Sequence, residues 1–273
     1  MLKFWKKIKW RKLLYASLWL ITLGGLGFLM SFIEVKSSEY ACNDLQVIIP
    51  GEQSFIVRED IDKVLENTQG ELVGKTLSAI PIHEIEEDLR AIPFVEKAIV
   101  SKDISGKISI SIKQREAVLR VINQMGSDFY LDSDGLKMPL SAHYAPHVLV
   151  ANGWINEVYS KSLDSIQTPQ LEDLFEIAQY IRQDTLWDSQ IEQLYLNSQG
   201  KIEMVPRVGN QRITIGNAES LDEKFDKLLV FYKKIIPSVG WDAYRSVDLS
   251  FAGQLVCERN EENRGNFKEN IIQ

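Results

Sequence analysis

The chain has 273 residues, of which 45% are hydrophobic and 25% are charged, a composition that fits one or two globular domains. Its formal net charge is −7, and its Lys and Arg residues beyond position 12 form no basic stripe. Because phosphate binding needs clustered Lys and Arg, this charge pattern excludes nucleic acid as a partner.

The N-terminal region has the pattern of a membrane anchor. Residues 1–12 carry basic side chains and no acidic ones, and residues 13–33 carry no charge. A helix over 13–33 would be about 31 Å long, enough for a hydrocarbon core of about 30 Å. We therefore predict a transmembrane helix over 13–33, with the basic segment 1–12 in the cytoplasm and the rest of the chain outside it. Residues 34–44 are expected to form a stalk.

Two alternatives for the N-terminal region fit the sequence less well. A cleaved signal peptide would have an apolar region of about 7–15 residues and small residues at its cleavage site. Cys42 could indicate a lipoprotein, but it lies well beyond the apolar run and follows Glu39 and Tyr40. Cys42 and Cys257 are expected to stay unpaired, and the absence of C-x-x-C removes the usual zinc or redox motif.

Residues 45–115 have the pattern of a small sheet with two helices. Strands are expected over Leu45–Ile49 and on both sides of a turn at Ser105–Gly106, and the second helix should end before Pro93. Apolar residues at helical or strand spacing define these elements: Val57, Ile61, Val64, Leu65, Ile82, Ile85, Leu89, Ile92, Ile108, Ile110 and Ile112. The order strand, helix, helix, strand, strand belongs to the α+β class. Placed directly after an anchor, it resembles a POTRA module.

Residues 116–259 are expected to form a β-rich domain with two helices. Asp132–Gly135 has the composition of a hairpin turn and lacks the full pattern of a calcium loop. One helix should begin at Thr168-Pro169 with Thr168 as its cap and run through Arg182. The other should begin with a capping box formed by Ser220 and Glu223 and end at Pro237.

The chain closes on a hairpin over Tyr244–Asn260 that turns at Ala252-Gly253. Its last strand is expected to be an edge strand, which a fold must either cover or use for pairing with another chain. Alternation along Gln254–Arg259 places Leu255 and Cys257 on one face and the residues between them on the other. Residues 260–273 are polar and patternless, and we expect a mobile tail there.

The sequence offers little support for catalysis. His143 and His147 have metal-like spacing only in a helix, and Pro146 argues against a helix there. The carboxylates in residues 84–88 follow a helical pattern that is typical of a solvated face. The chain has no phosphate-binding loop and no serine nucleophile motif. We therefore predict a binding protein that is not an enzyme and has no cofactor or metal.

The order of these modules resembles that of the FtsQ/DivIB family of bacterial cell-division proteins. The resemblance rests on "IPFVEKAIVSKDISGKISISIKQREAV", "DFYLDSDG", "ITIGN" and "VDLSFAGQLV" in this order after an anchor. Two departures stand out. Ala117 follows Arg115-Glu116 where the family often has a proline, and the family's terminal Asp-Leu-Arg-Tyr is Asp248-Leu249-Ser250-Phe251 here. Contacts made by main chain are unaffected by the second departure.

The resemblance implies a divisome scaffold that binds FtsB-like and FtsL-like bitopic proteins and helps recruit and regulate septal peptidoglycan synthesis. In Gram-negative members the FtsB segment adds a strand to the last strand of the β domain, and the POTRA module contacts other divisome proteins. The implied location is the inner membrane at the division septum, with the bulk of the chain in the periplasm. The implied partner-binding residues are Phe251, Gln254, Leu255, Val256, Cys257, Glu258 and Arg259.

Two other classes of function are compatible with parts of the pattern. A POTRA-containing component of envelope protein assembly or secretion would share the first module. An anchored enzyme acting on the cell wall would need two carboxylates facing each other across a cleft. The closing hairpin favours the scaffold.

Overall fold

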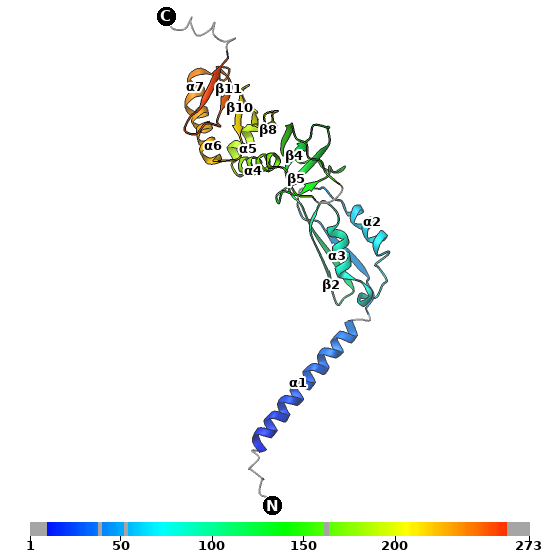
Figure 1. Ribbon diagram of the computed structural model, residues 1–273. Helices are drawn as coiled ribbons and strands as arrows, with labels where there is room; N and C mark the ends of the chain where they lie inside the picture. Colours follow the sequence, from blue (N-terminus) through cyan, green and yellow to red (C-terminus); the bar gives the residue numbers. More distant parts are fainter. Residues whose placement is uncertain (1–9, 38–39, 52–53, 161–163, 261–273) are drawn as a thin grey trace, which may run out of the picture. The chain divides into compact units, whose positions relative to one another are not determined.

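The computed structural model describes residues 10–37, 40–51, 54–160 and 164–260. These residues form two compact units. The first takes in Arg58–Ile92 and Lys97–Lys113 with the described residues up to Pro50, and the second takes in Gly51–Val57, Pro93–Glu96 and the described residues from Gln114 onward. Figure 1 shows the order of the elements. The mixed helix and sheet content agrees with the predicted α+β class.

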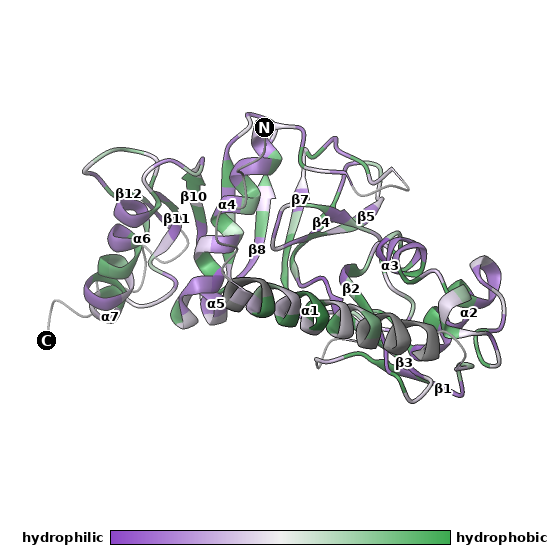
Figure 2. Cartoon of the chain, turned by 90° about the horizontal axis from the view of Figure 1, so that it is seen from below, coloured by the Kyte–Doolittle hydropathy of each residue, from purple (hydrophilic) through white to green (hydrophobic). Residues whose placement is uncertain are grey.

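The predicted transmembrane helix is not found. The chain is helical over α1 (Trp10–Ser37), but no helix among the described residues is both long and apolar enough to cross a membrane. Residues 14–28 of α1 are mostly apolar, as the colouring of this helix in Figure 2 indicates, and their side chains are exposed. Most of the predicted segments 1–12 and 260–273 lies outside the described residues.

The first unit contains the predicted three-stranded sheet. Its strands have the order β1-β3-β2, with β1 parallel to β3. The elements are β1 (Asp44–Ile48), α2 (Arg58–Thr68), the 3-10 helix η1 (Leu77–Ala79), α3 (Ile82–Arg90), β2 (Val95–Lys102) and β3 (Lys107–Gln114). Ile108, Ile110 and Ile112 of β3 are buried, as alternation predicts. The expected stalk differs, because α1 continues to Ser37 and Cys42 exchanges backbone hydrogen bonds with Gly74 and Lys75.

The second unit is built on a nine-stranded mixed sheet. The strand order is β12-β11-β10-β9-β8-β7-β4-β5-β6, with parallel pairs β4/β7, β7/β8 and β10/β11. The strands are β4 (Ala117–Ile122), β5 (Asp128–Asp132), β6 (Lys137–Met138), β7 (Leu149–Gly153), β8 (Ile191–Leu196), β9 (Ile202–Pro206), β10 (Arg212–Gly216), β11 (Tyr244–Asp248) and β12 (Val256–Arg259). One face of this sheet supplies the core.

The helices of the second unit pack against that core face. They are α4 (Pro169–Gln183), α5 (Thr185–Gln190), α6 (Leu221–Val230), the π-helix η2 (Phe231–Ile235) and α7 (Ile236–Val239). The predicted end of the last helix at Pro237 is wrong. The helix passes through the π-helical turn, includes Pro237 in α7 and ends at Val239.

Short segments around Phe55 and Phe94 belong to the second unit, although both lie within the predicted first domain of 45–115. The two rings stack with centroids 5.5 Å apart, and Phe55 also packs edge-on against Tyr130 and Tyr144. Burial of these aromatic side chains explains why the two segments group with the second sheet.

Candidate partner-binding edge

The last strand lies at one end of the nine-stranded sheet. Within the described residues β12 pairs only with β11, in an antiparallel register that joins Val247 to Cys257 and Asp248 to Val256. The strand is shorter than predicted, because Gln254 and Leu255 precede it and belong to the connection from β11. The other predicted site residues in Val256–Arg259 are in the strand.

The two faces of β12 differ as the alternation predicts. Leu255 and Cys257 are half-buried and pack against the core of the second unit. Val256 and Glu258 are exposed on the opposite face, where the Ser246 hydroxyl donates to the Glu258 carboxylate at 3.1 Å. Phe251, in the connection, is also exposed. The core therefore holds one face of β12, and no other strand of the described residues pairs with its outer edge.

One hydrogen bond fixes the direction of the backbone groups along β12. The Asn260 N–H donates to the Ala243 carbonyl at 3.1 Å, on the β11 side. Since N–H and C=O groups of successive strand residues point to alternate sides, Val256 and Glu258 also direct theirs toward β11. Cys257 and Arg259 direct their N–H and C=O groups toward the outer edge. This parity could not be derived from the sequence.

The opposite end of the sheet is covered. The edge strand β6 has only two residues, Lys137 and Met138, and both are buried. Leu136 forms an isolated antiparallel bridge with Ser165, and the Lys137 N–H donates to the Asp164 carbonyl at 2.7 Å. A crossing segment thus occupies the outward groups of β6, which is one of the ways in which proteins protect an edge.

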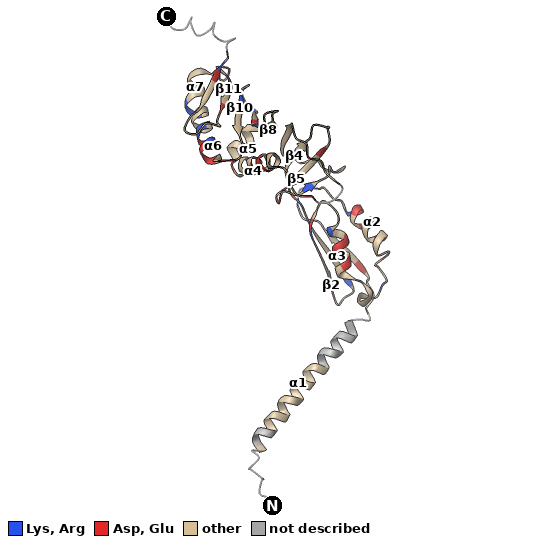
Figure 3. Ribbon diagram, viewed as in Figure 1, with Lys and Arg blue, Asp and Glu red and all other residues tan. Residues whose placement is uncertain are grey.

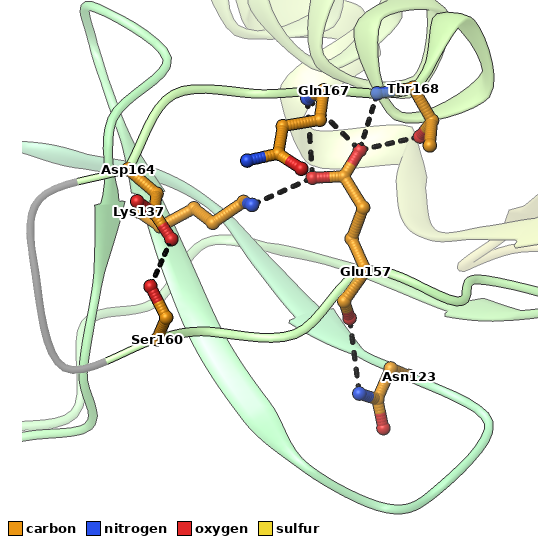
Figure 4. Close-up of polar contacts among 7 residues, drawn as sticks. All are labelled: Asn123, Lys137, Glu157, Ser160, Asp164, Gln167 and Thr168. Carbon is orange, nitrogen blue, oxygen red and sulfur yellow. Dashed lines mark hydrogen bonds and ion pairs between the residues drawn. The ribbon is translucent and has the colours of Figure 1, made fainter.

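An ion pair fastens this covering segment. Figure 4 shows Lys137 reaching the carboxylate of Glu157, with 2.8 Å between Nζ and Oε2. The same carboxylate accepts from the Thr168 N–H at 2.7 Å, from the Thr168 hydroxyl at 2.5 Å and from the Gln167 N–H at 3.2 Å. Thr168 is the N-cap residue of α4, as predicted, but its hydroxyl donates to Glu157 and makes no capping bond to the helix.

The pKa of Glu157 reflects this setting. Burial alone would raise the pKa, but the hydrogen bonds from Lys137, Thr168 and Gln167 outweigh burial and leave the pKa below its ordinary value. The carboxylate is therefore charged at neutral pH and pairs with the ammonium of Lys137.

The predicted capping box of α6 is wrong, and its residues have another use. Ser220 has a positive φ of 52° and makes no side-chain bond to the helix. The Glu223 carboxylate instead accepts from the Gly253 N–H at 2.7 Å, in the connection between β11 and β12. Lys227, one turn further along α6, donates to the carbonyls of Leu249 at 2.9 Å and Phe251 at 2.6 Å.

The other predicted candidates belong to other elements of the chain. His143 and His147 are in an irregular segment, and the acidic residues of α3, visible in Figure 3, lie on a partly exposed helix where Glu86 pairs with Arg90 at 3.3 Å. Asp132 accepts from the N–H groups of Asp134 and Leu136 and pairs with Arg115 at 2.6 Å, so this turn is tied by hydrogen bonds and an ion pair.

The described residues contain no group of three or more His, Cys, Asp or Glu that could hold a metal ion. Both cysteines are free, and burial raises the pKa of each thiol. A raised pKa makes a thiol less reactive.

Family comparisons match both parts of the chain. Residues 116–258 match the family described as FtsQ/DivIB, C-terminal related, and residues 40–113 match the POTRA-like domain. The chain belongs to the FtsQ/DivIB-related family. Proteins of this family are generally scaffolds without enzymatic activity and are associated with bacterial cell division. A search of curated proteins finds no match.

Proposed function

We propose that this FtsQ/DivIB-related protein is a divisome scaffold that receives a strand of an FtsB-like bitopic protein along β12. An FtsL-like protein joins the same complex, and the POTRA-like domain contributes contacts to other divisome members. Through these contacts the protein helps to recruit and regulate septal peptidoglycan synthesis.

One observation supports the strand-addition mode above the others. Within the described residues, the sheet of the second unit has one covered edge at β6 and one edge at β12 with which no further strand pairs. Cys257 and Arg259 direct backbone donors and acceptors outward at β12. An added strand gains affinity from such groups, and alternate side chains set its specificity. The β12 edge, with Ser250 and Phe251 in place of the family's Arg and Tyr, favours recognition by main chain.

The proposal includes a location at the inner membrane of the division septum, with the bulk of the chain in the periplasm. This location rests on family membership and on the charge-free run over 13–33 in the sequence. A fluorescent fusion of the full chain should gather at midcell before constriction. An even distribution round the cell, with normal division after depletion, would rule out the division role.

The binding mode is tested by co-purification of the full chain with the FtsB-like and FtsL-like proteins of the same organism. The partners should co-purify with the full chain and be lost from a chain that ends at Gly253. Truncation removes β12, so a variant with the fold retained is needed as well. Cys257→Pro removes an outward N–H, and retention of both partners by this variant would place the binding site elsewhere.

A further inference from the structure

The connection between β11 and β12 is held by two charged side chains of one helix. Lys227 donates to the carbonyls of Leu249 and Phe251, and Glu223 accepts from the Gly253 N–H. The two side chains also pair with each other at 3.4 Å. We name Glu223 and Lys227 the turn clamp.

The helix that carries the turn clamp is itself fixed in the core. Phe225 and Leu228 of α6 are buried, and Phe225 packs against Trp187 and Tyr180. The clamp side chains leave the helix on its other side, and a cavity of about 420 Å³ between α6 and the connection is lined by both. Because α6 is packed in the core, the hydrogen bonds from the turn clamp hold the connection between β11 and β12 in a fixed position relative to the core.

The clamp acts on a segment with few other constraints. The Leu249 N–H donates to Thr214 of β10 at 2.8 Å, and Asp248 accepts from Ser250. Beyond Ser250, the clamp holds the carbonyl of Phe251 and the N–H of Gly253, where the chain reverses with a φ of +65°. β12 starts three residues later. The Gln254 N–H also donates to the Phe251 carbonyl at 3.4 Å, and Leu255 packs against the core. Glu223 and Lys227 therefore help to set the path by which the chain enters β12.

We infer that Glu223 and Lys227 are positioning residues that hold β12 ready for an incoming strand. This inference rests on the proposed function, because it assigns a role to the clamp at the proposed binding edge. An edge strand that is already ordered saves the conformational entropy that binding would otherwise have to overcome. The clamp does not contact the outward N–H and C=O groups of Cys257 and Arg259, so its effect is on their placement.

The test uses the purified full chain and the FtsB-like protein of the same organism. Lys227→Met should weaken binding by about tenfold, since it removes two charge-assisted hydrogen bonds to the connection. In the free chain it should also accelerate hydrogen exchange at the amides of Gly253, Val256 and Glu258 by about tenfold or more, with β8 and β9 unchanged. Lys227→Arg keeps the positive charge and the hydrogen-bond donors, so it should restore most of the affinity and most of the protection from hydrogen exchange.

Two further variants make the test decisive. Lys233→Met makes the same change of charge on an exposed residue of η2 and should leave binding and exchange as they are in the original chain. Glu223→Gln serves as the test if Lys227→Met does not fold. The side chain of Glu223 is 48% exposed and glutamine has the same size, so this variant should weaken the bond to Gly253 and keep the fold. It should accelerate exchange at Gly253 and weaken binding by a smaller factor.

The possible failures can be told apart. If Cys257→Pro leaves the affinity unchanged, the proposed binding mode fails and the positioning role fails with it. If Cys257→Pro abolishes binding but Lys227→Met and Glu223→Gln stay within twofold of the original affinity, only the positioning role is overturned. Loss of binding that Lys227→Arg fails to restore, with exchange at the connection unchanged, would likewise overturn it.

Discussion

Lys137 and Glu157 form an ion pair of 2.8 Å in which the two side chains are only 2% and 6% exposed. The pair joins β6 to the segment that leads into α4, and both partners lie at the covered end of the sheet. A buried ion pair contributes little net free energy to folding, because desolvation of both charges offsets their attraction. Removal of one partner is costly, because it leaves the other charge buried and unpaired. This asymmetry gives a direct mutational prediction.

Glu157→Gln should lower the free energy of unfolding by about 3–5 kcal/mol, because it leaves the ammonium of Lys137 buried and unpaired. The double variant Lys137→Met with Glu157→Gln should lose less free energy of unfolding than Glu157→Gln alone, since it leaves no unpaired charge buried at this position. Urea denaturation of the three proteins measures this. The exposed pair of Arg245 and Glu258 serves as a control, for which Arg245→Met should cost about 0–1 kcal/mol. Equal losses in the single and double variants would contradict the argument.

The same carboxylate predicts how stability depends on pH. The folded state lowers the pKa of Glu157 relative to the unfolded chain, so the stabilisation is fully present above the unfolded pKa of about 4.3. It is lost as pH falls through the lower, folded pKa. The urea midpoint should therefore decline below about pH 4.3, and less steeply in Glu157→Gln, which has no titrating group at this position. Parallel pH profiles for the two proteins would assign the decline to other carboxylates.

Proline substitution at two adjacent positions tests the parity of β12. Cys257→Pro removes an N–H that faces the outer edge, so it should abolish or strongly weaken partner binding with a small loss of stability. Glu258→Pro removes an N–H that faces β11 and should destabilise the hairpin by about 3 kcal/mol. Affinity and thermal unfolding are measured on both. A larger loss of stability in Cys257→Pro than in Glu258→Pro would reverse the parity.

A glycine at the end of β7 should be intolerant of any side chain. Gly153 has a φ of +101°, and a Cβ there would lie 2.2 Å from the Leu196 carbonyl oxygen of β8. Gly153→Ala should therefore cost more than about 3 kcal/mol. Gly200 is the matched control, because it has a φ of +77° and a Cβ added there would meet no atom within 4 Å. Gly200→Ala should cost about 1 kcal/mol. Equal losses of stability in the two variants would show that the backbone at Leu196 can move away from a Cβ at position 153.

Periodicity in the sequence was enough to predict most of the fold. The alternating isoleucines of β3 and the apolar stripes of α2, α3 and α4 led to correct elements, because burial of one face controls these patterns. The short α5 was missed, since its six residues are too few to show a helical period. The turn at Ala252-Gly253 and the edge position of β12 were also predicted correctly.

What the sequence could not supply depends on contacts between distant residues. Glu223 has the spacing of a capping box with Ser220, but its partner is Gly253, thirty residues away. Thr168 has the place of a helix cap, but Glu157 takes its hydroxyl. The residues next to Lys137 in the sequence do not indicate that it is buried, because the carboxylate that pairs with it belongs to Glu157, twenty residues further along the chain. Local patterns list the possible partners of such groups, and only the tertiary fold selects among them.

The contrast between the two ends of the nine-stranded sheet limits how assemblies can grow. Open-ended fibres form when each subunit presents both a donor edge and an acceptor edge, so that every addition creates a new site. In the nine-stranded sheet, β6 is blocked by its own crossing segment, and among the described residues no second strand pairs with β12 beyond β11. A strand added at β12 would therefore leave this sheet no second edge of its own with which another strand could pair. Under the proposed function, each nine-stranded sheet takes up one partner strand.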